Sequence, residues 1–350
     1  MGRRGLLFLI CLLLLTGCHD GYWQHQQSVS ALSADTVHPG CETVEEDVSL
    51  PDTITMSFVG DVMLSSEYYA GTYMTFNPFA KTVEPRYFFE KMLSVFSADD
   101  WTVANCENVF TDQIQEMAEK NYTPAYWYAS GTENAGILPA GSVEVVSLAN
   151  NHALDFGWSG FNDTEAALQA AGVIPVGEKK SVVLEKHGVR VALFCCSMYS
   201  ANHLPAILDW LGNAVEHTDY QIVYFHGGTE RIHEPEEWKI SACRALVDAG
   251  ADLVLGNHPH VLQPYEAYNG GEIVYSLGNF LFGGSRSCEN ATIVFRLVIE
   301  AKEGRIVGTS SEILPCFCYG EWWQPYMMED GEEKQAVLDF MYGRRESPVE

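Results

Sequence analysis

Residues 54–61 read ITMSFVGD, an apolar run of β type that ends in a carboxylate. The same arrangement returns at 101–107 (WTVANCE), 143–152 (VEVVSLANNH), 221–226 (QIVYFH) and 253–260 (LVLGNHPH). In each stretch a carboxylate, amide or imidazole side chain comes at the end of a predicted strand. Divalent ions bind such donors, and ligands from several strand ends make a rigid pocket. The series therefore predicts a metal site built across a whole α/β domain.

Helical spacing separates these runs at 86–96, 158–171 and 235–249, and Gly172 and Gly250 follow the last two segments as C-terminal glycines. Hairpins are predicted at 180–196, 265–275 and 292–314, the second around Asn269-Gly270-Gly271. Alternating strands and helices followed by hairpins predict an α/β fold of mixed sheets with helices outside.

The N-terminus has the features of a secretory signal. Arg3 and Arg4 precede an apolar run at 5–15 that is short for a membrane span, and the run leads into Leu15-Thr16-Gly17-Cys18, which resembles a bacterial lipobox. We expect cleavage after 1–17 and lipid on Cys18; the alternative is an uncleaved anchor. Both alternatives place the protein at the cell membrane on its extracytoplasmic face.

Residues 18–51 are polar and acidic, so we expect a flexible tether, followed by a domain at 52–327 and an acidic surface helix or tail at 328–350. Without the signal the chain has 18 basic and 47 acidic residues, a net charge of −29. Such a charge excludes nucleic acid as an expected partner, because phosphate binding needs clustered Lys and Arg. An anionic ligand remains possible where bound cations cancel the charge locally.

The ten cysteines show no paired C-x-x-C spacing of a zinc finger. Cys195 and Cys196 lie in an apolar run and are interpreted as core residues. Cys41, Cys316 and Cys318 are candidates for disulfides in an oxidising compartment, with no connectivity implied.

Among the acidic candidates, Asp61 is interpreted either as a metal ligand or as a helix N-cap, and Glu107 either as a ligand or as a solvated surface group. Asn151 offers an amide oxygen to a divalent ion, and His152 can work as an acid or base near neutral pH. Asp155 either orients His152 or caps the following helix.

His226 ends a strand and opens into two glycines, whereas a lone His there is usually a core or surface residue. His258 and His260 flank a proline on a segment predicted to be extended, which gives two imidazoles a spread suited to one or two metals. Residues 276–280 (SLGNF) either line the pocket or make a tight turn. His217 and His233 fit no pattern and are expected on the surface.

The stretches 58–64, 149–157, 256–264 and 275–280 resemble the CapA family, in the same order along about 54–285. That family is linked to bacterial poly-γ-glutamate capsule synthesis and is grouped with the calcineurin-like metallophosphoesterases. The resemblance implies a four-layer α/β/β/α sandwich with a dinuclear metal centre at strand ends.

By the same resemblance, one metal would be held by Asp61 and His260, a second by Asn151, His226 and His258, and Glu107 would bridge them. His152 would protonate a leaving oxygen. The chain departs from the phosphatase pattern at Met63, where a D-x-H motif would have its His, and at Glu107, which replaces an Asp. The Trp usual after the family's counterpart of His226 is also missing.

These observations predict a lipid-anchored, metal-binding protein of capsule or surface-polymer biosynthesis or export, with capsule synthetase or export proteins as partners. Manganese, zinc and iron each suit the donors. One alternative is a metal-dependent phosphoesterase acting on a phosphorylated envelope metabolite. A second is a non-enzymatic scaffold that binds an anionic polymer.

Overall fold

The computed structural model describes residues 50–70, 75–284, 289–320 and 322–348. The predicted signal 1–17, the lipid-bearing Cys18 and residues 18–49 of the predicted tether lie outside the described residues. Within the described ranges, no helix combines the length and the apolar character that a membrane span requires.

The first sheet is built around β1 (Asp52–Met63), which has parallel neighbours in β3 and β14 and an antiparallel neighbour in β15. Eight strands of the described chain belong to it. Their order is β17 (Tyr326–Met327), β16 (Arg305–Phe317), β15 (Ala291–Lys302), β1, β3 (Trp101–Cys106), β6 (Val145–Ser147) and β7 (Ile174–Val176), with β14 (Asn279–Phe282) paired to β1.

The second sheet has a parallel centre, in which β10 lies between β9 and β11. Its order is β12 (Leu262–Tyr268), β13 (Gly271–Leu277), β11 (Leu253–Asn257), β10 (Tyr220–His226), β9 (Val189–Ser197) and β8 (Lys180–Lys186). A small third sheet joins β2 (Ser66–Glu67), β5 (Tyr128–Ser130) and β4 (Val109–Phe110).

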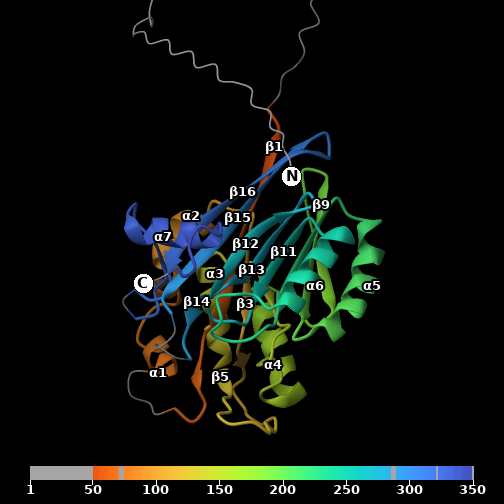
Figure 1. The fold of residues 1–350 in the computed structure, drawn as a ribbon. Helices are drawn as coiled ribbons and strands as arrows, with labels where there is room; N and C mark the ends of the chain where they lie inside the picture. The colour runs from red at the N-terminus through yellow and green to blue at the C-terminus, as the bar shows by residue number, and fades with distance from the viewer. Residues whose placement is uncertain (1–49, 71–74, 285–288, 321, 349–350) are drawn as a thin grey trace, which may run out of the picture. The chain divides into compact units, whose positions relative to one another are not determined.

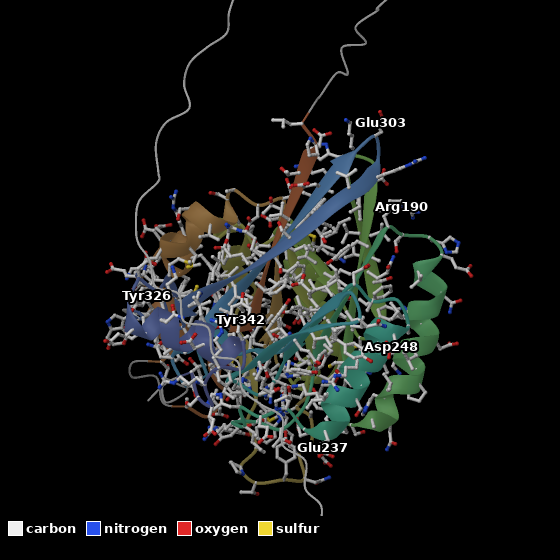
Figure 2. The ribbon with its side chains drawn as sticks, turned by 45° about the horizontal axis from the view of Figure 1, so that its top comes forward. Arg190, Glu237, Asp248, Glu303, Tyr326 and Tyr342 are labelled. Atoms are coloured by element: carbon white, nitrogen blue, oxygen red, sulfur yellow. The ribbon has the colours of Figure 1, made fainter. Side chains whose placement is uncertain are left out.

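The helical segments connect these strands. They are α1 (Phe76–Ala80), the 3-10 helix η1 (Pro85–Met92), α2 (Leu93–Phe96), η2 (Thr132–Gly136), α3 (Ile137–Ala140), α4 (Gly157–Ala170), η3 (Ala201–His203), α5 (Leu204–Val215), α6 (Glu237–Asp248) and α7 (Glu332–Met341). Glu237 and Asp248 mark the two ends of α6 in Figure 2.

The two large sheets pack face to face. Side chains on a strand alternate between the two faces of the sheet, and Phe58 of β1 shares one buried apolar cluster with Leu193 of β9 and Leu255 of β11. The hydroxyl of Tyr224 in the second sheet donates to the Val59 carbonyl of the first, at 2.6 Å. The main core of the protein is therefore the space between the sheets.

Helices cover both outer faces. Val59, on the opposite side of β1 from Phe58, packs in a cluster with Phe88 and Phe89 of η1. On the second sheet, Phe194 packs with residues of α5 and α6, which lie outside that sheet in Figure 1. The α/β class and the predicted four-layer α/β/β/α sandwich are confirmed.

Near the C-terminus, α7 lies within the segment expected as an acidic helix or tail. Val337, Phe340 and Met341 are buried and join the cluster between the sheets. The helix contacts β12 and β16, so its acidic residues lie on the remaining face.

The three predicted hairpins are confirmed as β8–β9, β12–β13 and β15–β16. Each turn has a residue followed by glycine with positive φ: His187 at 53°, Asn269 at 47° and Glu303 at 53°. Figure 2 places Glu303 at the tip of its hairpin. Two left-handed residues in a two-residue turn match the right-handed twist of the paired strands.

Two local predictions were wrong. The helix expected at 86–96 is mostly the 3-10 helix η1, with α2 following it. The helix α5 was not predicted at all, although its residues Ile207 and Leu211 are buried against the second sheet.

Candidate metal centre

The six predicted metal ligands meet between residues of the two large sheets. Asp61 lies in β1 of the first sheet, Glu107 directly follows β3, and Asn151 lies in the loop after β6. The other three come from the second sheet or the loop after β11: His226, His258 and His260. Hydrogen bonds and charge contacts join all six into one group.

Asp61 lies within β1, because the strand continues to Met63, so both the expected strand end and the N-cap alternative were wrong. The pairing of β1 shifts register around this residue. Its amide donates to the Gly278 carbonyl at 3.0 Å. A side chain at Gly60 would place its Cβ 1.8 Å from that carbonyl oxygen, so only glycine permits this approach.

Glu107 occupies the middle of the group. Its Oε1 lies 3.4 Å from His226 Nε2, 3.8 Å from His260 Nε2 and 4.0 Å from His152 Nε2. The side chain is fully buried, and neither oxygen has a hydrogen-bond partner among the described residues. A buried carboxylate normally has partners, because an unpaired charge costs several kcal/mol. A cation between Glu107 and the imidazoles would provide them.

His226 Nε2 is the contact point for further donors. It lies 2.8 Å from Asn151 Oδ1 and 3.0 Å from His258 Nδ1. Asn151 is exposed, whereas His226 and His258 are buried, so the group reaches solvent on the side of Asn151.

The two histidines after β11 take an unexpected backbone conformation. The prediction of an extended segment was wrong, because φ is 97° at His258 and 57° at His260. Left-handed backbone is unfavourable for a non-glycine residue and occurs preferentially at functional sites. The bend directs His258 N to Asp61 Oδ2 at 3.2 Å and His260 Nδ1 to the same oxygen at 3.2 Å.

Asn279 is one of the residues for which two interpretations were open. Its Oδ1 lies 2.9 Å from His260 Nδ1, and the side chain is buried. The segment 276–280 therefore lines the centre.

Two sets of ligand atoms are close enough to hold a cation. The atoms of Asp61, Glu107 and His226 lie within 4.8 Å of one another, and so do those of Glu107, His258 and His260. Glu107 belongs to both. Nitrogen and oxygen donors of this kind suit Mn, Fe and Zn, so the residues present fit a metal centre.

The electrostatics of the group favour a cation. Burial opposes ionisation of Asp61, yet hydrogen bonds from His226 and His260 hold its pKa well below the usual range. Burial also opposes protonation of His260, but Glu107 and Asp61 raise its pKa to about 10. Burial lowers the pKa of His258 well below its usual value, with the charges of the other two histidines acting in the same direction.

His152 and Asp155 form a pair beside the centre. His152 Nδ1 lies 2.8 Å from Asp155 Oδ2, which also accepts from Tyr128 N at 2.9 Å. Asp155 makes no capping bond to α4, so it orients His152 rather than starting the helix. The pair directs His152 Nε2 towards Glu107.

Lys120 was missed by the sequence analysis. Its ammonium group lies 2.5 Å from Asp155 Oδ1 and 3.4 Å from His152 Nδ1, with only 7% of its side chain exposed. Residues 111–127 contain no helix or strand, so no periodicity marks Lys120.

Asn105 and Asn150 were missed as orienting residues. Asn105 Nδ2 donates to Asp61 Oδ1 at 2.8 Å and lies 3.1 Å from His226 Nδ1. Asn105 Oδ1 accepts from Asn150 Nδ2 at 3.1 Å. Their positions one or two residues before predicted ligands were the available signal.

Three residues singled out in the sequence lie outside the candidate centre. Met63 packs in an apolar cluster with Tyr128 and Phe282, so it supplies no donor in place of a histidine. His233 is half-buried and lies 3.0 Å from Glu289 Oε2, whereas it was expected on the surface. Cys316 is buried and forms no disulfide.

The remaining residues behave as follows. Cys195 and Cys196 are core residues, as predicted. His217 is exposed, as expected. Cys41 lies outside the described residues.

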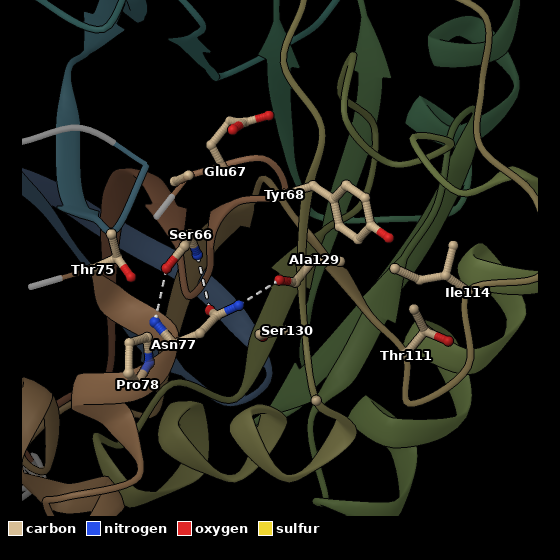
Figure 3. A pocket seen from close by; sticks show the side chains of 12 residues that line it. Ser66, Glu67, Tyr68, Thr75, Asn77, Pro78, Thr111, Ile114, Ala129 and Ser130 are labelled. Atoms are coloured by element: carbon tan, nitrogen blue, oxygen red, sulfur yellow. Dashed lines mark hydrogen bonds between the residues drawn. The ribbon is translucent and has the colours of Figure 1, made fainter. Parts of the chain in front are cut away.

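Two cavities lie in this part of the protein. The cavity in Figure 3, about 330 Å³, is lined by residues such as Ser66, Asn77 and Ala129, and none of the six predicted ligands lines it. Its polar groups bond one another: Asn77 exchanges two hydrogen bonds with Ser66 and donates a third to the Ala129 carbonyl. The other cavity, about 450 Å³, has Asn151 in its wall and therefore adjoins the centre.

Comparison with solved structures gives weak overall superpositions. A phosphatase from Mycoplasma pneumoniae has a TM-score of 0.46 and 13% identity, over 76% of this chain and 95% of that one. A hypothetical protein from Thermus thermophilus has a TM-score of 0.44 and 17% identity, over 75% and 99% of the two chains.

Comparison of sequences is more informative. The PGA biosynthesis protein CapA of Bacillus subtilis (strain 168) is 32% identical over 283 residues, which cover 73% of this chain and 71% of that protein. The capsule biosynthesis protein CapA of Bacillus anthracis is 28% identical over 276 residues, covering 70% and 64%. The family model of the bacterial capsule synthesis protein PGA_cap matches residues 55–284, which include all the site residues described above. The chain therefore belongs to the PGA_cap family of bacterial capsule synthesis proteins.

Proposed function

We propose that this protein binds a pair of divalent metal ions and acts in the assembly or export of an anionic surface polymer of the poly-γ-glutamate type. The observation that carries the metal assignment is Glu107, a buried carboxylate without a hydrogen-bond partner among the described residues, facing three imidazoles. The polymer assignment is supported by family membership and by the similarity to the PGA biosynthesis protein CapA of Bacillus subtilis.

Six residues would hold the ions. By the family resemblance, Asp61 and His260 would hold one ion and Asn151, His226 and His258 the other. The sets of close ligand atoms instead group His226 with Asp61 and His260 with His258, and Glu107 belongs to both sets. When bound, such ions supply positive charge that polarises a phosphate or carboxylate oxygen. Asn105 and Asn279 would orient Asp61 and His260.

Counting metals on the purified full-length protein tests this assignment. We expect wild type to retain a pair of Mn, Fe or Zn ions and Glu107→Gln to lose most of them, because the amide removes the shared charge. Glu90→Gln, which changes an exposed carboxylate, is the matched control. If wild type binds no more metal than Glu107→Gln, the metal assignment is wrong.

The cellular role has a separate test. Deleting the gene in its own host should reduce the surface polymer, wild type should restore it, and Glu107→Gln should not. A deletion strain with normal surface polymer would contradict the role in polymer assembly while leaving the metal assignment intact.

Anchoring outside the cytoplasm is the third part of the proposal. Its support is the lipobox-like sequence that ends at Cys18, upstream of the family match, which begins at residue 55. Metabolic labelling with a fatty acid should label wild type but not Cys18→Ala. The Cys18→Ala protein should also be lost from the membrane fraction. Unlabelled wild type would exclude the lipid anchor.

Phosphoester hydrolysis is a second candidate, favoured by the His152–Asp155 pair. Asp155 accepts from Nδ1 and so fixes the ring with Nε2 facing the centre, where this nitrogen could exchange a proton with a substrate. With a chromogenic phosphodiester and added manganese, we expect wild type to hydrolyse the substrate. The hydrolysis rate of His152→Ala should be lower by about 100-fold or more. No turnover by metal-loaded wild type would exclude this candidate.

A further inference from the structure

The cavity beside the candidate metal centre has no role in the metal assignment. Its volume of about 450 Å³ lies in the range of small-ligand pockets, roughly 300–1,000 Å³. Its wall comes from the loop between β6 and α4, from α4 itself, from the turn between β7 and β8, and from the segment between the end of β9 and η3. We propose that this cavity binds a segment of a carboxylate-bearing polyamide chain and presents it to the centre, an inference that rests on the proposed function.

One wall of the cavity is apolar although it faces solvent. Trp158 is 65% exposed, Leu154 is 40% exposed and Tyr199 is 36% exposed. Trp158 packs edge to face on Phe161, at 5.4 Å between ring centroids, which holds it on α4. Exposed apolar side chains gathered at one opening mark a contact surface. They suit the methylene groups of a polymer backbone.

The turn between β7 and β8 gives the cavity one lysine that has no ion-pair partner among the described residues. Lys180 is paired with Glu165 at 3.2 Å, and Glu178 accepts a hydrogen bond from Ser197 N at 2.9 Å. Lys179, between them, forms no ion pair with any described residue. Its φ is 55°, and its amide donates to the Cys195 carbonyl at 3.2 Å. Lys179 lines the cavity, and its backbone is held there in a conformation that is unfavourable for a non-glycine residue.

The negative charge of the whole protein limits the places where an anionic polymer can bind. A chain of net charge −27 repels a polyanion over most of its surface. An unpaired ammonium beside a cation-binding centre concentrates the attraction at one place, and charge complementarity of this kind sets specificity. Phosphate groups are typically held by several cations or by backbone amides at a helix start. One lysine facing a long apolar wall fits widely spaced carboxylates better.

The cavity and the centre share residues. Asn151 belongs to both, and the ring of Tyr199 lies 5.2 Å from the ring of His258. A chain held between Trp158 and Lys179 would therefore pass over Tyr199 and reach the centre at Asn151.

Binding measurements on the full-length, metal-loaded protein test the inference. Poly-γ-glutamate oligomers of defined length are titrated by calorimetry, with polyphosphate as the second ligand. We expect wild type to prefer the glutamate oligomer, Lys179→Met to bind it about fivefold more weakly, and Trp158→Ala about tenfold more weakly. Lys302→Met, at the far hairpin, should bind like wild type, and Lys179→Arg should recover most of the loss.

The outcomes separate this inference from the proposed function. Metal content is measured on every variant. If wild type holds its metals but does not bind the oligomer, or if Lys179→Met and Lys302→Met bind it equally, the cavity assignment is wrong and the metal assignment stands. Tighter, Lys179-dependent binding of polyphosphate would also overturn it. Oligomer binding by a protein that holds no metal would support the cavity and contradict the metal assignment.

Discussion

Two buried acids at the centre show how differently the same chemical group can be satisfied. Asp61 accepts from the amide of Asn105 and from the backbone of His258, and charged imidazoles lie near both its oxygens. Glu107 has charge contacts of 3.4–4.0 Å but no hydrogen bond among the described residues. An ionised carboxylate in that position destabilises the fold unless a cation accompanies it. Glu107, which lacks hydrogen-bond partners among the described residues, is therefore a better indicator of a cation site than Asp61, which has them.

Asn105 allows a prediction about orientation. Asn105→Ala removes the donor to Asp61 and the contact to His226, so both ligands lose a fixed orientation. We expect metal affinity to fall about 10- to 100-fold and the free energy of unfolding to fall by about 1–3 kcal/mol. Metal titration and urea unfolding measure these effects, with the exposed Asn213→Ala as control. Unchanged affinity in Asn105→Ala would show that Asp61 is oriented without it.

At the scale of elements, the strands reach the centre only because some backbones approach very closely. Gly60 lets β1 pass against the Gly278 carbonyl, and Gly227 lets the segment after β10 pass against the Met198 carbonyl, with 1.8 Å from an added Cβ to the oxygen in both cases. These glycines place Asp61 and His226. The positions of Asp61 and His226 thus depend on the absence of a side chain at the preceding or following glycine as well as on packing.

A matched pair of glycine substitutions tests this view. Gly60→Ala should destabilise the protein by several kcal/mol, because the backbone of β1 must move away from Gly278. Gly212→Ala, in α5 with no atom within 4 Å of the added Cβ, should stabilise it by about 0.5–1 kcal/mol. Urea unfolding measures both. Two substitutions with equal effects would contradict the close approach.

Lys239 of α6 braces two of the segments that carry ligands. Its buried ammonium donates to the Gly227 carbonyl at 3.1 Å and to Gln263 Oε1 at 2.8 Å, and it faces the ring of Phe225 at 5.2 Å. Gly227 follows His226, and Gln263 lies three residues after His260. No described acidic group forms an ion pair with this ammonium.

The buried lysine predicts a pH dependence. Burial lowers the pKa of Lys239 to about 8, while a lysine of the unfolded chain titrates near about 10.4. Between these pH values the unfolded chain keeps a proton that the folded chain has released, so stability from this group rises with pH. From pH 8 to 10.5, the free energy of unfolding of wild type should rise by about 3 kcal/mol relative to that of Lys239→Met. A constant difference across that range would contradict the lowered pKa.

For the whole molecule, the centre joins the two large sheets. Asp61 and Glu107 come from strands of the first sheet or the residue directly after one, and His226 comes from a strand of the second. A cation bound by residues of both sheets would hold the sheets together as well as neutralise the acids. Ligands that bind only the folded state stabilise it by mass action.

Chelation should therefore unfold the protein more easily. With metal at about 100 times its dissociation constant, removal costs about 2.7 kcal/mol for each ion, which in a folded unit of this size corresponds to a fall in Tm of roughly 4 °C per ion. Glu107→Gln should show little change on chelation. Calorimetry with and without chelator measures both, and an unchanged Tm in wild type would contradict a structural role for the metals.

The features that follow from local sequence were predictable. The candidate ligands Asp61, Glu107 and His226 could be grouped because each comes with an apolar strand, and strands that alternate with helices end at one edge of a sheet. Hairpins with Asn-Gly or Glu-Gly turns were predictable because glycine, and asparagine more than most residues, adopts left-handed backbone at low cost, between two runs of strand type. The helix α4 was marked by its period and by Gly172.

Only the tertiary structure decided which side chains support the ligands. Lys120 is 32 residues from His152, and Asp61 is 197 residues from the backbone of His258. Neither pair shares an element or a period, so no local pattern contains the contact. The left-handed backbone at His258 is likewise unfavourable for an isolated segment and persists because the surrounding fold holds it. Local physics determined which residues could bind a cation, and long-range packing determined their geometry.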